Sequence, residues 1–279
     1  HSIALANGSF ALTAAYMSIG LKRGDEIITT PRTFLATAST AVLLGIKPVF
    51  ADIDLNSGAI TPEYIEKKIS NKTKAISVVH LGGWPAQIEE IVELAKKYNL
   101  KVIEDCSQAH GAKYNGKNVG SFGDVATWSF CQDKIISTGG EGGMLSTNSY
   151  EVWNNAFSLK DHGKNFDILC NVNTNPGFKW LHETIGTNMR LTEIQAALGR
   201  NQLKKLSEWT NLRKRNAMIL YQALKDLKLV RIPLPEYNLE NAWYRFYCYL
   251  NFDFLALDWT RERIMLQIQE KGVKVFTGS

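Results

Sequence analysis

Apolar, β-branched runs alternate with helical patterns through the first two thirds of this chain, and no other feature narrows the choice of fold as much. Strands are predicted at SIALA, DEIITT, KPVFAD, TKAISVVHL, LKVIEDC, ATWSF and GGMLST. Helices are predicted at residues 9–21 and 34–44, at TPEYIEKKI, and at AQIEEIVELAKKYN, where apolar residues recur at helical spacing. This alternation indicates an α/β domain with a mostly parallel sheet and helices on both faces.

The pattern changes from Leu191 onwards. Apolar residues at helical spacing predict one long amphipathic helix that runs past Trp209 towards Leu227. IPLPEYN then reads as a linker, and AWYRFYCYLNF alternates polar and aromatic residues as a half-buried strand does. We expect a large α/β domain over residues 1–208 and the start of a smaller α+β domain over residues 209–279, with these aromatic residues packed inside it. The chain opens directly on a strand and closes on one just begun, so we expect both ends to continue in a longer protein.

Composition limits the kinds of partner. Of the 279 residues, 45% are hydrophobic and 21% are charged, which is ordinary for a globular protein. The formal charge of +5 is spread along the chain without a block of like charges, so we expect no nucleic acid as a partner. The four cysteines match no zinc pattern, which predicts no metal site and free thiols in a reducing cytoplasm. There is no apolar stretch of about 18 residues and no signal peptide before His1, so we expect no membrane insertion.

Two segments present groups of chemical interest at the ends of predicted elements. The helix start at Gly8, in ANGSFAL, offers free backbone amides that can bind an anion, although an ordinary helix cap explains it as well. LKVIED ends in Glu104 and Asp105 at the carboxyl end of a strand, where parallel sheets bind ligands. A buried carboxylate there needs a partner such as a cationic ring nitrogen; alternatively, Asp105 caps the following turn.

Lys134 stands five residues after Ser129 and shortly before GGEGG. A lysine in such a place can bind phosphate, or its amine can be desolvated, neutral and nucleophilic. The chain holds 32 Lys and Arg residues, so a single lysine is by default an ordinary surface cation. What favours chemistry is the order of a small polar helix start, an acid at a strand end and Ser-x4-Lys before glycines. No GxGxxG follows the first strand, which disfavours an NAD-linked oxidoreductase.

That combination resembles the DegT/DnrJ/EryC1/StrS family of pyridoxal-phosphate-dependent nucleotide-sugar aminotransferases. The resemblance runs along the whole chain and rests on five ordered motifs, which are ANGSFAL, PRTFLATAST, VIEDCSQAHGA, SFCQDKIISTGGEGGML and GTNMRLTEIQAALGR. It implies the fold-type-I aminotransferase architecture, with a mostly parallel seven-stranded sheet in the large domain. The chain departs from the family at its helix start, where Asn7-Gly8-Ser9-Phe10 is bulkier than Ser-Gly-Thr-Ala, and at Cys131, where histidine is common.

The resemblance implies two catalytic residues and a glutamine that binds the cofactor. Lys134 matches the lysine that bonds covalently to pyridoxal 5′-phosphate and carries the proton during transfer. Asp105 matches the aspartate that pairs with the pyridinium nitrogen and keeps it protonated. Gln108 matches the glutamine that reaches the phenolic oxygen of the cofactor.

Further cofactor-binding residues follow from the same resemblance. Ser129 matches a phosphate ligand, as do the helix-start residues Ser9 and Phe10, the latter through its backbone amide. Phe34, in PRTF, falls where an aromatic ring stacks on the pyridine. Asn188, in GTNMR, matches an asparagine that reaches the phosphate in the neighbouring subunit's site, which implies a homodimer with shared active sites.

The implied reaction moves an amino group from glutamate to the keto group of a nucleotide-linked deoxy sugar and releases 2-oxoglutarate. Its product would serve lipopolysaccharide, capsule or other glycan biosynthesis. One alternative is a cofactor-dependent sugar dehydratase of the same superfamily, but such enzymes replace the aldimine lysine, commonly with histidine, and this chain has Lys134. A catalytically silent regulatory relative has no physical need for Asp105, Gln108, Ser129 and Lys134 together.

Four other residues are weaker candidates, each with an ordinary structural role as the simpler interpretation. His80 and His110 are predicted close to the edge of the sheet, and His162 belongs to a His-Gly pair. Arg190 is a candidate ligand for an anionic amino donor or for the sugar nucleotide.

Overall fold

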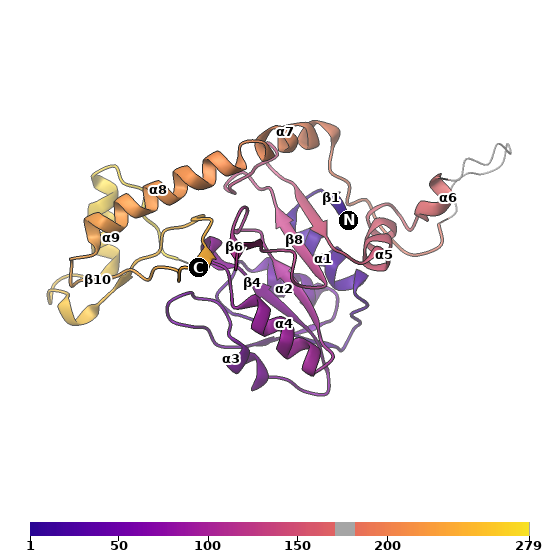
Figure 1. Ribbon diagram of the computed structural model, residues 1–279, viewed down its shortest axis with the longest axis horizontal. Helices are drawn as coiled ribbons and strands as arrows, with labels where there is room; N and C mark the ends of the chain where they lie inside the picture. The colour runs from indigo at the N-terminus through magenta and orange to yellow at the C-terminus, as the bar shows by residue number, and fades with distance from the viewer. Residues whose placement is uncertain (171–181, 279) are drawn as a thin grey trace.

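A seven-stranded sheet forms the centre of the computed structural model, which describes residues 1–170 and 182–278 (Figure 1). The strands lie in the order β1-β9-β8-β5-β4-β2-β3. Within this sheet β9 pairs antiparallel with β1 and β8, whereas the other pairs are parallel. The predicted mostly parallel sheet is therefore confirmed. Its strands are β1 (Ser2–Leu5), β2 (Glu26–Thr29), β3 (Lys47–Phe50), β4 (Thr73–Val79), β5 (Lys101–Asp105), β8 (Val125–Ser129) and β9 (Gly143–Ser146).

Helices cover both faces of this sheet. Successive strand residues point to opposite sides, so apolar side chains lie on both faces and need cover there. Ile27 of β2 joins one apolar core and Ile28 joins the other. The first core also takes residues of α1, α2 and α5, and the second takes residues of α3 and α4. The helices are α1 (Gly8–Ser18), α2 (Ala36–Leu43), α3 (Pro62–Glu66), α4 (Ile88–Lys97), α5 (Tyr150–Lys160) and the short α6 (Phe166–Cys170).

Local sequence explains where α1 and α4 begin and which way they face. Asn7 caps α1, since its Oδ1 accepts a hydrogen bond from the amide of Phe10 at 2.8 Å. In α4, the spacing of Ile88, Ile91 and Ala95 places all three on one buried stripe. Acidic residues in its first turn and lysines in its last turn complement the helix dipole.

Two helices occupy the region where the sequence predicts one. These are α7 (Glu193–Leu203) and α8 (Leu206–Leu224). The side-chain oxygen of Gln202 in α7 accepts a hydrogen bond from the Ser137 amide at 2.7 Å, which ties α7 to the loop after Lys134. In contrast, α8 runs towards β10 and α9 (Figure 1). The single-helix prediction was wrong at Lys204 and Lys205, where the helix is interrupted, and neither Gly nor Pro marks the break.

The strand predicted at AWYRFYCYLNF is limited to Tyr249–Leu250 (β12), which pairs with β10 (Val230–Arg231). The residues before it bond to a loop of the large sheet instead. The amides of Ala242 and Arg245 donate to the carbonyls of Gly83 and Gly82 at 2.9 and 3.1 Å. Trp243 between them has a φ of 51°, which no strand residue adopts. The strand prediction was therefore wrong for residues 242–248.

The remaining described elements are short. A three-stranded ribbon joins β6 (Lys113–Tyr114), β7 (Lys117–Asn118) and β11 (Leu239–Glu240), and the others are η1 (Leu81–Gly83), η2 (Phe252–Phe254) and α9 (Arg261–Glu270). Across residues 1–170 and 182–278, no helix is both long and apolar enough to cross a membrane. The domain boundary expected at residue 208 falls in the first turn of α8 and stays a prediction.

Candidate active site

A cavity of about 620 Å³ opens at the carboxyl ends of β4, β5 and β8, where a parallel sheet is expected to bind ligands. Its lining comes mainly from residues 7–12, 33–37, 105–108, 129–134 and 244–247. Six predicted site residues lie in this lining: Ser9, Phe34, Asp105, Gln108, Ser129 and Lys134. Segments far apart in the sequence thus meet as the ordered motifs predict.

Phe10 and Asn188 are placed differently. The ring of Phe10 packs against the first apolar core, and its amide is bonded to Asn7. Asn188 is exposed and forms an isolated β-bridge with Asp161, and its side-chain oxygen accepts from the Arg190 amide at 3.3 Å. Arg190 in turn forms an ion pair with Asp161.

Asp105 ends β5 with its side chain in the cavity wall and only 5% of its surface exposed. Its Oδ2 accepts a hydrogen bond from the Thr37 hydroxyl at 2.9 Å. Its Oδ1 accepts from the Ser107 amide at 3.1 Å, so the turn-capping role is present as well. Both donors are neutral, which leaves the buried negative charge available to a cationic group in the cavity.

The start of α1 presses against the ends of β8 and β9, and glycine makes this approach possible. A Cβ on Gly8 would lie 2.8 Å from the Cβ of Ser129, and one on Gly143 would lie 2.3 Å from the carbonyl oxygen of Asn7. Ser9 and Ser129 thereby share one wall of the cavity with the first amides of α1. Hydroxyl groups around a helix N-terminus suit an anion, above all a phosphate.

Lys134 also lines the cavity and lies in a network of four polar side chains. Its Nζ donates to the hydroxyl of Tyr244 at 3.2 Å and lies 3.7 Å from Oδ1 of Asp133. Asp133 also accepts from Tyr244 and, at 3.2 Å, from Arg245. Burial would raise the pKa of Asp133, but the hydrogen bond from Tyr244 and the charges of Lys134 and Arg245 outweigh it and hold the pKa below its ordinary value.

Tyr244, Arg245 and Tyr247 are lining residues that the sequence interpretation missed. It assigned the aromatic residues of this segment to packing, because their alternation looked like that of a strand. The interrupted strand gave no local signal, since the turn at Trp243 contains no glycine.

His80 and Glu104 form a buried pair behind the cavity. Nε2 of His80 lies 3.1 Å from Oε2 of Glu104, and the amide of Ala86 donates to Nδ1 of His80 at 3.0 Å. His80 therefore carries a hydrogen on Nε2, which donates a hydrogen bond to Oε2 of Glu104. The amides of residues 120, 122 and 123 donate to the same carboxylate at 2.7–2.8 Å. Burial would raise the pKa of Glu104, but the bond from His80 and these amides lower it overall.

His110 is enclosed by aromatic rings. Its ring centre lies 5.5 Å from that of Trp128 and 5.7 Å from that of Phe130. Burial lowers the pKa of His110 to about 3, so the side chain is neutral at physiological pH. His80 and His110 thus have the structural roles that were the simpler interpretation.

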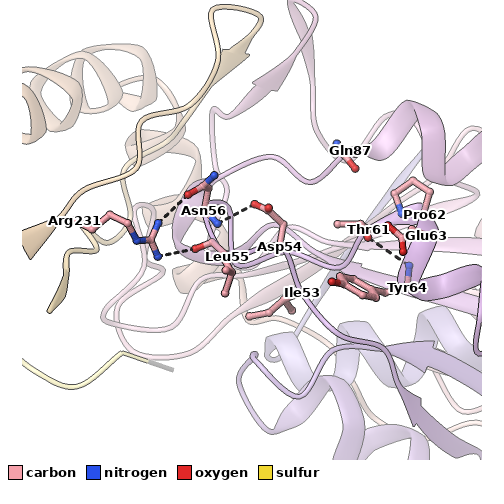
Figure 2. Close-up of a pocket in the computed structure, with 10 residues that line it drawn as sticks. All are labelled: Ile53, Asp54, Leu55, Asn56, Thr61, Pro62, Glu63, Tyr64, Gln87 and Arg231. Atoms are coloured by element: carbon pink, nitrogen blue, oxygen red, sulfur yellow. Dashed lines mark hydrogen bonds between the residues drawn. The ribbon is translucent and has the colours of Figure 1, made fainter. Parts of the chain in front are cut away.

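Figure 2 shows a second hollow, of about 740 Å³, between β10 and the loop that follows β3. Arg231 donates to Oδ1 of Asn56 at 2.8 Å and to the carbonyl of Leu55 at 3.1 Å. Asp54 accepts from the amides of Asn56 and Ser57 at 3.0 and 2.7 Å. These groups tie the C-terminal segment to the loop, and the hollow lies outside the five motifs.

The sheet order, the helices on both faces and the cavity at the strand ends define a fold-type-I aminotransferase architecture. Residues 1–277 match the DegT/DnrJ/EryC1/StrS aminotransferase family, and the chain belongs to this family. The GDP-perosamine synthase of Escherichia coli O157:H7 is 40% identical over 222 residues, which are 80% of this chain and 58% of that protein. The chain thus spans well under two thirds of that relative's length.

Two solved structures show the same fold. An aminotransferase from Psychrobacter cryohalolentis is 45% identical with a TM-score of 0.94, over 98% of this chain and 71% of that chain. A GDP-4-keto-6-deoxy-D-mannose-3-dehydratase from E. coli, with bound hydrated pyridoxal phosphate, is 25% identical with a TM-score of 0.87, over 98% of this chain and 72% of that chain.

Proposed function

We propose that this chain is the major part of an aminotransferase that uses pyridoxal 5′-phosphate to move an amino group from glutamate to a keto group of a nucleotide-linked deoxy sugar. The observation that carries this proposal is the meeting of Lys134 and Asp105 in one cavity whose wall also holds Ser9 and Ser129. A nucleophilic amine, a carboxylate partner for the ring nitrogen and an anion site are groups with which proteins hold this cofactor.

The residues present fit the cofactor. Asp105 is a buried carboxylate whose hydrogen-bond donors are neutral, so it suits a protonated ring nitrogen. The α1 amides with Ser9 and Ser129 suit a phosphate dianion, at a place where glycine at position 8 lets α1 approach Ser129 closely. When bound, pyridoxal phosphate supplies an electron sink for the electrons left behind when a substrate C–H bond breaks.

The other residues then have defined tasks. Lys134, which lines the cavity, would hold the cofactor covalently and afterwards carry a proton to and from the substrate carbon. Gln108 would orient the cofactor through its side-chain amide, because its Oε1 is already fixed by the Gly82 amide at 2.7 Å. Phe34 would cover one ring face and exclude water there.

A homodimer is part of the proposal, and an exposed apolar face beside the cavity supports it. Phe34 lines the cavity, and the neighbouring Leu35 and, on α2, Val42 and Leu43 expose 72%, 58% and 85% of their surface. Such a patch typically marks an interface. A second copy seated on this face would close the cavity, and its exposed Asn188 would be free to reach the phosphate.

Two further expectations belong to the same proposal. All four cysteines are free, which suits a reducing cytoplasm. Residues 209–279 would begin a smaller domain that contributes Tyr244 and Arg245 to the cavity.

The dehydratase alternative has one observation in its favour, which is the similarity to the E. coli 3-dehydratase. Lys134 argues against it, because such dehydratases carry another residue, commonly histidine, in place of this lysine.

The test is the absorbance spectrum of the full-length protein with pyridoxal phosphate. We expect a band at the edge of the visible region that glutamate bleaches, and Lys134→Ala should lack both the band and the response. A wild-type protein that binds the cofactor without this band would refute the aminotransferase proposal.

A further inference from the structure

The amino group of Lys134 is held by a residue 110 positions later in the chain. Nζ donates to the Tyr244 hydroxyl at 3.2 Å and lies 4.8 Å from the centre of the Tyr244 ring. The Lys134 side chain is 12% exposed and Tyr244 is 6% exposed, so this contact is largely shielded from solvent.

The Tyr244 hydroxyl is oriented by its other partners. It donates to Asp133 and accepts from Nη2 of Arg245 at 3.1 Å as well as from Lys134. Burial and the hydrogen bond to Asp133 raise the pKa of Tyr244 well above its ordinary value, so the hydroxyl keeps its proton. With the proton committed to Asp133, the oxygen faces the two cations.

The backbone around Tyr244 is fixed to η1, the short turn that follows β4. The amides on either side, of Ala242 and Arg245, donate to the carbonyls of Gly83 and Gly82. A Cβ on Gly83 would lie only 3.0 Å from the amide nitrogen of Trp243, so the two segments approach as closely as glycine allows.

The same contact reaches the predicted cofactor ligand Gln108. The Gly82 amide donates to Oε1 of Gln108 at 2.7 Å, while the Gly82 carbonyl accepts from Arg245 at 3.1 Å. Trp243 is held at a φ of 51°, and its amide donates to Oδ1 of Asn241 at 2.7 Å. A non-glycine residue in this conformation persists only where its surroundings impose it, and such residues cluster at functional sites.

We propose that Tyr244 is a positioning residue that holds the amino group of Lys134 at the cavity wall whenever that lysine is not bonded to a cofactor. Its catalytic value rests on the proposed function, since an amine that must return a proton to a substrate carbon gains from a fixed place. The contact that positions the Lys134 amino group depends only on Tyr244, Asp133 and Arg245.

The test measures acetylation of individual lysines by mass spectrometry in the full-length chain freed of cofactor, with Lys101 as internal reference. Tyr244→Phe keeps the ring and removes the hydroxyl, so Lys134 should react about tenfold faster relative to Lys101, as expected for one lost hydrogen bond to a charged group. Tyr98→Phe, which removes a surface hydroxyl bonded to Glu66, is the matched control and should leave the ratio unchanged.

Asp133→Asn is the second variant, because it removes the charge that orients Tyr244 and should raise the ratio by roughly threefold. An unchanged Lys134 ratio in Tyr244→Phe overturns the proposal. If Tyr244→Phe loosens the whole chain and Lys101 also reacts faster, Asp133→Asn decides, and an unchanged ratio there overturns it equally.

This labelling is independent of the aminotransferase proposal, because no cofactor or substrate takes part. If the chain proves unable to use pyridoxal phosphate, the labelling ratios still test the contact. In an active enzyme, Tyr244→Phe should lower kcat about tenfold and leave the KM for the sugar nucleotide unchanged. A change in KM alone would contradict a role through Lys134.

Discussion

Replacing Glu104 by Gln should destabilise the protein strongly, although Gln has the same size. The carboxylate is fully buried, with two donors at each oxygen: His80 and the Gly120 amide at one, the Phe122 and Gly123 amides at the other. A carboxamide has one acceptor oxygen, so in either orientation its NH2 group faces two donors. If His80 instead carried its hydrogen on Nδ1, that N–H group would face the amide donor of Ala86.

The size of the effect follows from these contacts. Two buried donors left without an acceptor cost about 1–3 kcal/mol each, so the free energy of unfolding should fall by about 2–6 kcal/mol. For a chain of this size that lowers the thermal midpoint by roughly 5–15 °C. Urea denaturation followed by circular dichroism measures the change.

Glu63→Gln is the matched control. Glu63 is exposed and pairs with Lys67 one helical turn away, so its loss should cost less than about 0.5 kcal/mol. Equal urea midpoints for Glu104→Gln and the wild type would refute the conclusion that Glu104 is a charged, fully bonded carboxylate.

The same carboxylate predicts a pH dependence with a definite sign. The folded-state pKa of Glu104 lies below its unfolded value, so its stabilising contribution is complete above the unfolded pKa and is lost as the pH falls through the folded pKa. The stability difference between the wild type and Glu104→Gln should therefore be constant near neutral pH and shrink in acid. A difference that grows in acid would contradict this sign.

Three further predictions concern the cavity and the proposed dimer. Gly8→Ala should destabilise the protein by about 1–3 kcal/mol, because its Cβ would lie 2.8 Å from that of Ser129. It should also weaken binding of pyridoxal phosphate more than that of pyridoxal, as titrations of both compounds would show. Asp105→Asn should slow the glutamate half-reaction on the order of a hundredfold in stopped-flow absorbance, and an unchanged rate would remove Asp105 from the mechanism. Leu43→Glu should convert a dimer to a monomer in light scattering, whereas Leu257→Glu, at another exposed leucine, should not.

The sequence predicted the central fold well because the seven-stranded sheet and the helices beside it follow strong periodic patterns. Each of the seven predicted strands appears in the sheet, and α1 to α4 lie where the sequence predicts helices. Asp105, Ser129 and Lys134 line one cavity. This could be expected from the sequence, because all three stand at or just after strand ends, which a parallel sheet brings to one edge.

The sequence failed where long-range contacts override local pattern. Residues 242–248 alternate like a strand, yet the amides of Ala242 and Arg245 bond to the carbonyls of Gly83 and Gly82, about 160 positions away. The break between α7 and α8 has no local signal either, and Gln202 beside it bonds to the distant Ser137 amide. The proposed role of Tyr244 beside Lys134 depends on the contact of its segment with Gly82 and Gly83, so no local signal in the sequence could have revealed it.

The most direct test of the central claim is borohydride reduction of the full-length protein incubated with pyridoxal phosphate, followed by peptide mass mapping. Reduction makes a bond between a lysine and the cofactor permanent. We predict a single pyridoxyl-phosphate adduct on Lys134, lost in Lys134→Ala and unchanged in a surface variant such as Lys101→Ala. An adduct on another lysine alone, or none at all, would contradict the assignment of Lys134 as the catalytic residue.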